Sequence, residues 1–198
     1  KGKDAPVPAW RAVRVVAERG GANRVAGLQA PFVGRETELR LLKDRFHATT
    51  RDGRARLVSV TGQAGIGKSR LAREFSIYVD GLIDTVYWHD GRSPAYGDGV
   101  PFSALGEMVR QRARLVESDD EATTRSRIAA MLETFVPVES ERRWIEPALL
   151  ALLAVGEPPP GGRDALFTAW RTFFERIAAA APTVLVFEDL HWADSGLI

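Results

Sequence analysis

The chain has 198 residues, of which 45% are hydrophobic and 27% are charged, and its formal net charge is +1. This balance is typical of a globular protein with a real core, and it argues against general electrostatic attraction to nucleic acids or membrane surfaces. The chain has no cysteine, which excludes disulfides and thiolate metal sites, and it has no apolar run long enough to span a membrane. We therefore expect a cytoplasmic location, without direct contact to nucleic acid or membrane.

Residues 1–30 have the composition of a linker from an upstream domain, with two prolines and a Gly-Gly pair. Within them, Trp10–Val16 is apolar and β-branched enough for a short strand, although a loosely packed tail fits as well. A boundary follows at Pro31–Glu36, PFVGRE. From Glu36 to Ala48, apolar residues recur at helical spacing and predict a helix. Residues 31–198 are predicted to be the N-terminal part of a second domain.

The next stretch combines a short apolar run, a glycine-rich turn and a lysine. Leu57–Val60 is β-branched and apolar, which predicts a buried strand, and Arg70–Tyr78 has an apolar stripe that predicts a helix. The eight residues at 62–69, GQAGIGKS, match G-x-x-x-x-G-K-[ST], so the stretch is predicted to be a P-loop. The residues expected to touch a nucleotide here are Gly62, Gln63, Ala64, Gly65, Ile66, Gly67, Lys68, Ser69 and Arg70.

The spacing of a P-loop follows from the chemistry of a triphosphate. Glycines allow turns that other residues resist, so successive backbone N–H groups can point inward at the phosphates. The helix N-terminus adds partial positive charge. Lys68 is expected to reach the β- and γ-phosphates, and the Ser69 hydroxyl to ligate Mg²⁺.

Between this loop and the C-terminal end, the chain is mostly helical by pattern. Ile83–Trp88 predicts a second strand, and His89–Pro101 predicts a loop, either a plain surface connection or a lid or partner-binding loop. The acidic run Ser118–Glu121 is interpreted as a helix N-terminus rather than a metal site. Helices are predicted at Ser103–Val116, Ala122–Phe135, Glu139–Val155 and Arg163–Ala180.

A second motif begins at Thr183, where a buried apolar strand runs into Glu188 and Asp189. Open α/β sheets bind ligands at the carboxyl ends of their strands, and a P-loop enzyme needs an acid there for Mg²⁺. We interpret the motif as a Walker B strand. One count makes Glu188 the Mg²⁺ ligand and Asp189 the residue that orients the attacking water, while a shift of one residue makes Asp189 the ligand.

Three phrases together, PFVGRE at 31–36, VTGQAGIGKSRLAREF at 60–75 and VLVFEDLHWAD at 184–194, resemble the STAND class of P-loop NTPases. These are AAA-like ATPase domains of large bacterial signalling proteins. In such proteins the module commonly follows a class III adenylyl or guanylyl cyclase domain, or lies inside a LuxR-type regulator, and helical repeats come after it. The opening PVPAWRAVRVV is similar to the joint between such a cyclase and its ATPase.

The resemblance implies a three-layer αβα fold with a mainly parallel sheet, and a helical insertion between the second strand and the Walker B strand. It implies that Val33, Gly34 and Arg35 lie near adenine and ribose. His191, Trp192 and Asp194 would form the turn after the Walker B strand. It also implies a central strand between the P-loop and Walker B strands that this chain lacks, so we expect a sheet that is incomplete at its C-terminal side.

The function implied is an ATP/Mg²⁺-dependent switch whose ATP and ADP states are read by flanking domains, with slow hydrolysis in the longer parent and oligomerisation on ATP binding. Residues 1–198 alone are expected to bind nucleotide with little turnover. One alternative is an ATP sensor that does not hydrolyse, which the Glu-Asp order of the second motif keeps open. A small-molecule kinase and a replication-type ATPase are further alternatives, but the chain shows no acceptor pocket and no basic stripe.

Overall fold

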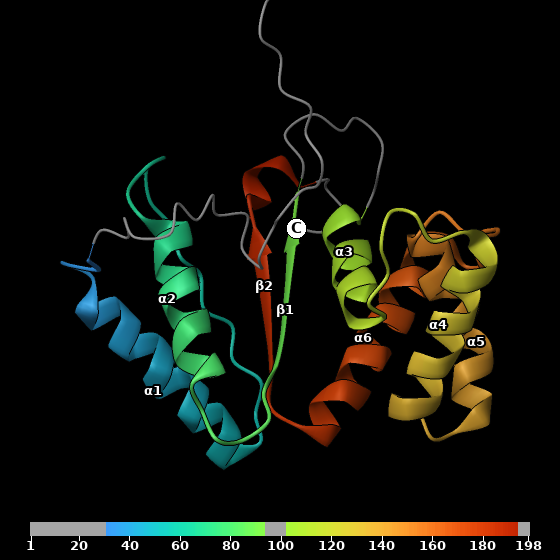
Figure 1. Ribbon diagram of the computed structural model, residues 1–198, viewed down its shortest axis with the longest axis horizontal. Coiled ribbons are helices and arrows are strands. Elements are labelled where there is room, and N and C mark those ends of the chain that lie inside the picture. Colours follow the sequence, from blue (N-terminus) through green and yellow to red (C-terminus); the bar gives the residue numbers. More distant parts are fainter. Residues whose placement is uncertain (1–30, 94–101, 194–198) are drawn as a thin grey trace, which may run out of the picture.

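The computed structural model describes residues 31–93 and 102–193, so the proposed strand at Trp10–Val16, most of the loop before Pro101, and Asp194 lie outside it. Helices lie on both sides of a small parallel sheet (Figure 1). In chain order the elements are α1 (Glu36–Asp52), α2 (Lys68–Asp80), β1 (Tyr87–Arg92), α3 (Ser103–Arg112), α4 (Glu121–Phe135), α5 (Glu139–Leu152), α6 (Gly162–Ala180), β2 (Thr183–Glu188) and the 3-10 turn η1 (Leu190–Trp192).

The two strands pair in parallel, with Tyr87 opposite Thr183 and Arg92 opposite Glu188. The chain between them forms α3 to α6, as the sequence predicts. Alternate residues of a strand face opposite sides of the sheet. Accordingly, the Trp88 ring lies 5.8 Å from Phe75 of α2, whereas the His89 ring on the other face lies 5.0 Å from Phe174 of α6.

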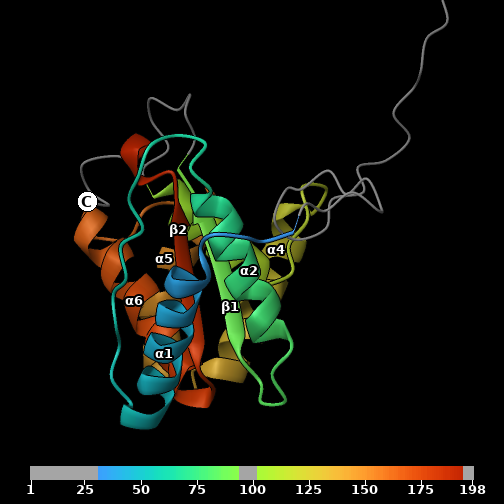
Figure 2. The ribbon, with the colours of Figure 1, turned by 90° about the vertical axis from the view of Figure 1, so that its left-hand side faces the viewer.

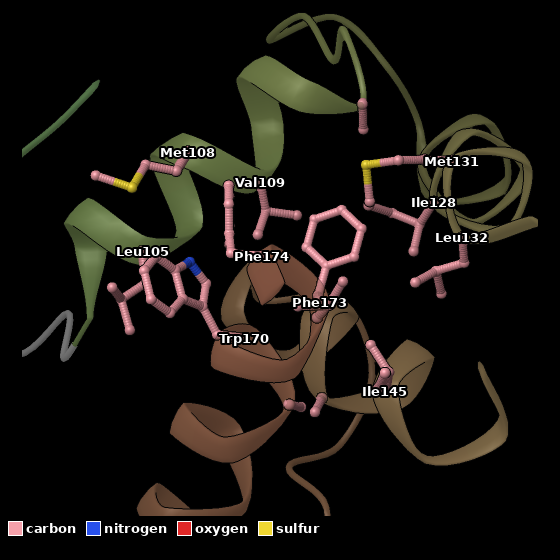
Figure 3. Close-up of a cluster of buried hydrophobic side chains, with 14 of the residues drawn as sticks. Leu105, Met108, Val109, Ile128, Met131, Leu132, Ile145, Trp170, Phe173 and Phe174 are labelled. Atoms are coloured by element: carbon pink, nitrogen blue, oxygen red, sulfur yellow. The ribbon is translucent and has the colours of Figure 1, made fainter. Parts of the chain in front are cut away.

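Most of the buried core lies between the sheet and α3 to α6. Figure 3 shows side chains from these four helices pointing toward one another. Within α6, Trp170, Phe173, Phe174 and Ile177 are buried, as their helical spacing predicts, and Leu166 is half-buried. By contrast, α1 has no buried residue and packs mainly against α2. The face of the sheet covered by α1 and α2 therefore has fewer buried apolar side chains than the face covered by α3 to α6.

The predicted helices are confirmed, and the differences at their ends have local causes. The helix α3 ends at Arg112 rather than Val116, because Arg114 adopts a left-handed backbone with φ of 55°. The acidic run before α4 is a helix N-terminus, as interpreted. The Asp120 carboxylate accepts the backbone N–H of Thr123 at 2.8 Å, and the Thr123 side chain, followed by this backbone N–H, holds the pKa of Asp120 below its usual range.

The strand predicted at Leu57–Val60 is wrong for this structure. The segment between α1 and α2 has no assigned strand, and Figure 2 shows it running apart from the two-stranded sheet. The Leu57 residue is 96% exposed. An apolar, β-branched run becomes a strand only when neighbouring strands pair with it, and among the described residues none does.

The second strand was predicted four residues too early. It runs from Tyr87 to Arg92, through residues that the sequence assigns to a loop beginning at His89. Gly91 resembles a strand breaker, but its missing side chain is what lets α3 approach. A Cβ atom on Gly91 would lie 2.2 Å from the carbonyl oxygen of Ala104 in α3.

We expect Gly91→Ala to destabilise the fold by about 1–3 kcal/mol, because α3 would have to move away from β1. Gly81→Ala is the matched control, since a Cβ there meets only backbone oxygens at 3.5 and 3.6 Å. Urea denaturation measures both variants. Equal stability of the two would show that the contact between β1 and α3 is not tight.

No helix in the described ranges is both long and apolar enough to cross a membrane.

Candidate functional site

The sequence motifs converge on one edge of the molecule. The carboxyl ends of β1 and β2, the turn η1 and the N-terminus of α2 all lie toward the top of Figure 1. Parallel strands place their carboxyl ends together, and this edge is where open α/β sheets bind ligands. The P-loop and the Walker B acids therefore share an edge, although they lie more than a hundred residues apart in the chain.

The loop before α2 has the backbone that its glycines allow. Gly65 has a φ of 76° and Gly67 a φ of 101°, both in the left-handed region that other residues avoid. Gly67 is the N-cap of α2, and a Cβ on either glycine would meet no atom within 4 Å. The loop thus faces open space in front of the first N–H groups of a helix, where an anion is favoured.

Lys68 is the first residue of α2, and its side chain folds back over the loop. Its Nζ donates to the carbonyl oxygens of Gly62 and Gln63, each at 3.0 Å. Both acceptors are neutral, so a phosphate oxygen offers the ammonium a stronger, charge-assisted partner. Ser69 follows in the first helical turn and is exposed.

Arg70, the last residue of the predicted nucleotide-binding set, is engaged along its own helix. Its Nε lies 2.8 Å and its Nη2 2.7 Å from Oε1 of Glu74, one turn further on. This i,i+4 pair supports α2.

The structure brings one residue of the Pro31–Glu36 motif to the P-loop. Arg35 Nη2 lies 3.5 Å from the carbonyl oxygen of Ile66, while its Nη1 donates to Oε1 of Glu38 at 2.9 Å. This second bond lowers the pKa of Glu38. Gly34, with a φ of 78°, donates its N–H to Glu36, and Val33 is 72% exposed. Arg35 is thus beside the loop, whereas the Val33 side chain projects into solvent.

The strand β2, interpreted from the sequence as a Walker B strand, ends at Glu188, and the chain turns sharply at Asp189. Asp189 has a φ of 56°, a left-handed conformation that costs free energy for a residue with a side chain, although aspartate tolerates it better than most. The turn η1 follows, where the His191 and Trp192 rings lie 5.1 Å apart. Both carboxylates therefore leave the sheet at its carboxyl edge.

Arg92 is the residue at this edge that sequence reasoning missed. Its Nη2 lies 2.6 Å from Oε2 of Glu188, and its Nε lies 3.4 Å from Oδ2 of Asp189. The hydrogen bond to Glu188 is the main cause that raises the pKa of Arg92. The parallel register places Arg92 directly opposite Glu188. Only extending the second strand to Arg92 would have revealed this pair from the sequence.

The residues present fit a phosphate-bearing ligand and Mg²⁺. The loop offers backbone donors, a helix N-terminus and an ammonium group, and the hydroxyl of Ser69 with the carboxylates of Glu188 and Asp189 are the hard oxygen donors that Mg²⁺ prefers. No cluster of three or more histidine, cysteine or acidic residues that could hold a metal occurs within the described part of the chain. Mg²⁺ in nucleotide sites usually rests on one or two protein ligands plus phosphates and water.

Comparisons with known proteins agree with this geometry at the level of the family. A family model described as the AAA ATPase domain matches residues 31–197. Comparison with curated proteins and with solved structures finds no match. The family model covers well over half of the chain and includes both the P-loop and the Walker B strand, so the chain has a P-loop α/β domain and belongs to the AAA ATPase domain family.

Proposed function

We propose that the chain is the Mg²⁺-dependent ATP-binding module of a switch protein. The observation that carries the proposal is Lys68, whose ammonium lies over two neutral carbonyls of a glycine loop at a helix N-terminus. The loop opens at the same edge of the sheet as Glu188 and Asp189. A cationic cradle at the same edge as two carboxylates suits a nucleotide phosphate together with its metal ion.

Each residue has a distinct task in this proposal. Backbone N–H groups of Gly62–Ser69 surround the phosphates, and Lys68 neutralises their charge. Ser69 and Glu188 hold Mg²⁺, with Asp189 as the alternative ligand. When bound, Mg²⁺ would help to neutralise the negative charge of the phosphates during phosphoryl transfer. Arg35, beside Ile66, borders the base and ribose end of the site.

The segment Leu57–Val60, where the structure lacks the predicted strand, leaves an apolar surface next to α1. Leu57, Val58 and Val60 are exposed apolar residues, and a depression between the segment and α1 is lined by Leu41, Arg45, Arg56, Leu57, Val58 and Ser59. Apolar side chains of this kind are normally covered when a sheet is complete.

The wider setting that we propose is a bacterial signalling protein of the STAND class. ATP and ADP favour different conformations of the module, and flanking domains read the difference, with a cyclase domain upstream or helical repeats downstream as the partners. Hydrolysis is slow, and oligomerisation accompanies ATP binding.

Hydrolysis of ATP in a single turnover, by the longest available form of the protein, tests whether the module is a switch or a sensor that does not hydrolyse. If Asp189 orients the attacking water, Asp189→Asn should slow the step by about 10²-fold or more, since positioned acid–base groups contribute on that scale. Asp164→Asn, on the surface of α6, is the matched control. An unchanged rate for Asp189→Asn would remove its catalytic role and favour the sensor.

A further inference from the structure

The two Walker B acids are tied to a cation from the neighbouring strand. Arg92 reaches Oε2 of Glu188 and Oδ2 of Asp189 with two different nitrogens, so one guanidinium bridges both carboxylates. Its backbone is also fixed, because its N–H donates to Oε2 of Glu107 in α3 at 2.8 Å, while the N–H of Ser93 donates to the carbonyl oxygen of Glu188. The bridge is thus built into the end of the parallel strand pair.

This bridge uses the oxygens that a metal ion needs. A guanidinium 2.6 Å from Oε2 of Glu188 occupies one of its lone pairs and cancels charge that would attract Mg²⁺. Mg²⁺ demands near-octahedral geometry and loses its waters reluctantly, so it gains little from a carboxylate that is already neutralised. The ion and the arginine therefore compete for the same acid.

The bridge is also weak enough to be exchanged. The Arg92 side chain is 59% exposed, against 25% for Glu188 and 45% for Asp189. Ion pairs with this exposure are screened by water and contribute little net stability. An exposed arginine can swing away from a strand end without disturbing the sheet, whose register is set by the backbone.

We propose that Arg92 is a positioning residue that sets the Mg²⁺ affinity of the site: it holds Glu188 and Asp189 while metal is absent and gives up Glu188 when the metal–nucleotide complex binds. This inference rests on the proposed nucleotide site. Its consequence is that nucleotide without metal leaves the bridge in place, whereas nucleotide with metal breaks it. The Arg92–Glu188 contact at the carboxyl end of β1 is therefore present with nucleotide alone and absent with nucleotide and metal together.

The test is a calorimetric titration of ADP into the whole chain at a series of Mg²⁺ concentrations, from EDTA to excess. We compare wild type with Arg92→Gln, which removes the charge, and with Arg125→Gln, which removes the arginine of an exposed ion pair on α4, away from the site. The quantity measured is the Mg²⁺ concentration that gives half of the gain in ADP affinity. Arg92→Gln should lower it about two- to fivefold, the range expected for an exposed ion pair, and Arg125→Gln should leave it unchanged.

The outcomes separate the inference from the proposed function. A wild-type chain that binds no ADP at any Mg²⁺ concentration overturns both. Wild-type binding with an unchanged or higher Mg²⁺ requirement in Arg92→Gln overturns the inference alone. Arg92→Lys provides a second variant, because an ammonium keeps the charge but has one nitrogen in place of the two with which Arg92 contacts the acids separately. Its Mg²⁺ requirement should fall between those of wild type and Arg92→Gln, and a value below that of Arg92→Gln would also contradict competition by charge.

Discussion

Lys68→Ala is expected to abolish nucleotide binding or to weaken it about 30-fold or more, since truncating one partner of a hydrogen-bonded charge pair costs about 2–5 kcal/mol. The side chain already lies over the loop, 3.0 Å from the carbonyl oxygens of Gly62 and Gln63, so little rearrangement is needed for it to meet a phosphate. Displacement of a fluorescent ADP analogue measures the loss.

Lys43→Ala is the control for Lys68→Ala. Lys43 lies in α1 with its Nζ 4.1 Å from the centre of the Tyr78 ring, so its removal changes the total charge equally without touching the loop. We expect the Lys43 variant to bind as wild type does. Equal affinities for all three proteins would rule out the phosphate role of Lys68.

Phe173→Ala is expected to destabilise the protein by about 3–5 kcal/mol, the range for removing a buried aromatic ring. Phe173 is 0% exposed and lies in the core formed by α3, α4, α5 and α6 (Figure 3). Domains are typically stable by only about 5–15 kcal/mol, so this variant should unfold at much lower urea concentrations or fail to fold.

Phe167→Ala, on the same helix, is the matched control. Phe167 is 42% exposed and stacks on Trp170 with 6.2 Å between ring centres, so it contributes less buried area. Its loss should cost less, because a large share of its surface is already in contact with water. Similar urea midpoints for the two variants would mean that the four-helix core does not dominate stability.

The helices and the P-loop could be predicted because their signals are local. The spacing of Trp170, Phe173 and Ile177 specifies the buried stripe of α6, and Asp120 marks the start of α4 through its own hydrogen bond. The glycines at 65 and 67 likewise indicate the left-handed turns that the structure contains. Such features depend on residues a few positions apart, so one sequence is sufficient to identify them.

The features that sequence reasoning missed depend on distant neighbours. Leu57–Val60 has the composition of a strand, but pairing decides whether it becomes one, and among the described residues its apolar side chains lack that partner. In the sequence, Gly91 resembles a residue that interrupts a strand, but in the structure it allows α3 to pack closely against β1. Arg92 meets Glu188 only because two strands 96 positions apart pair in parallel register.

The roles of Glu188 and Asp189 in metal binding and in orienting water stay predictions, and the structure shows one difference between the two residues. Glu188 ends the strand, whereas Asp189 begins a turn with a left-handed backbone, so the two carboxylates leave the sheet in different local geometries. Both are held by Arg92. A single cation therefore contacts both candidate metal ligands.

The most direct measurement of the central claim is calorimetric binding of ATP, ADP and adenosine to the wild-type chain in excess Mg²⁺. If the loop at Gly62–Ser69 binds phosphates, ATP and ADP should bind, and adenosine should bind at least about tenfold more weakly, because it forgoes every charge-assisted contact with Lys68. Adenosine that binds as tightly as ADP, or a chain that binds none of the three, would contradict a nucleotide site built around the phosphates.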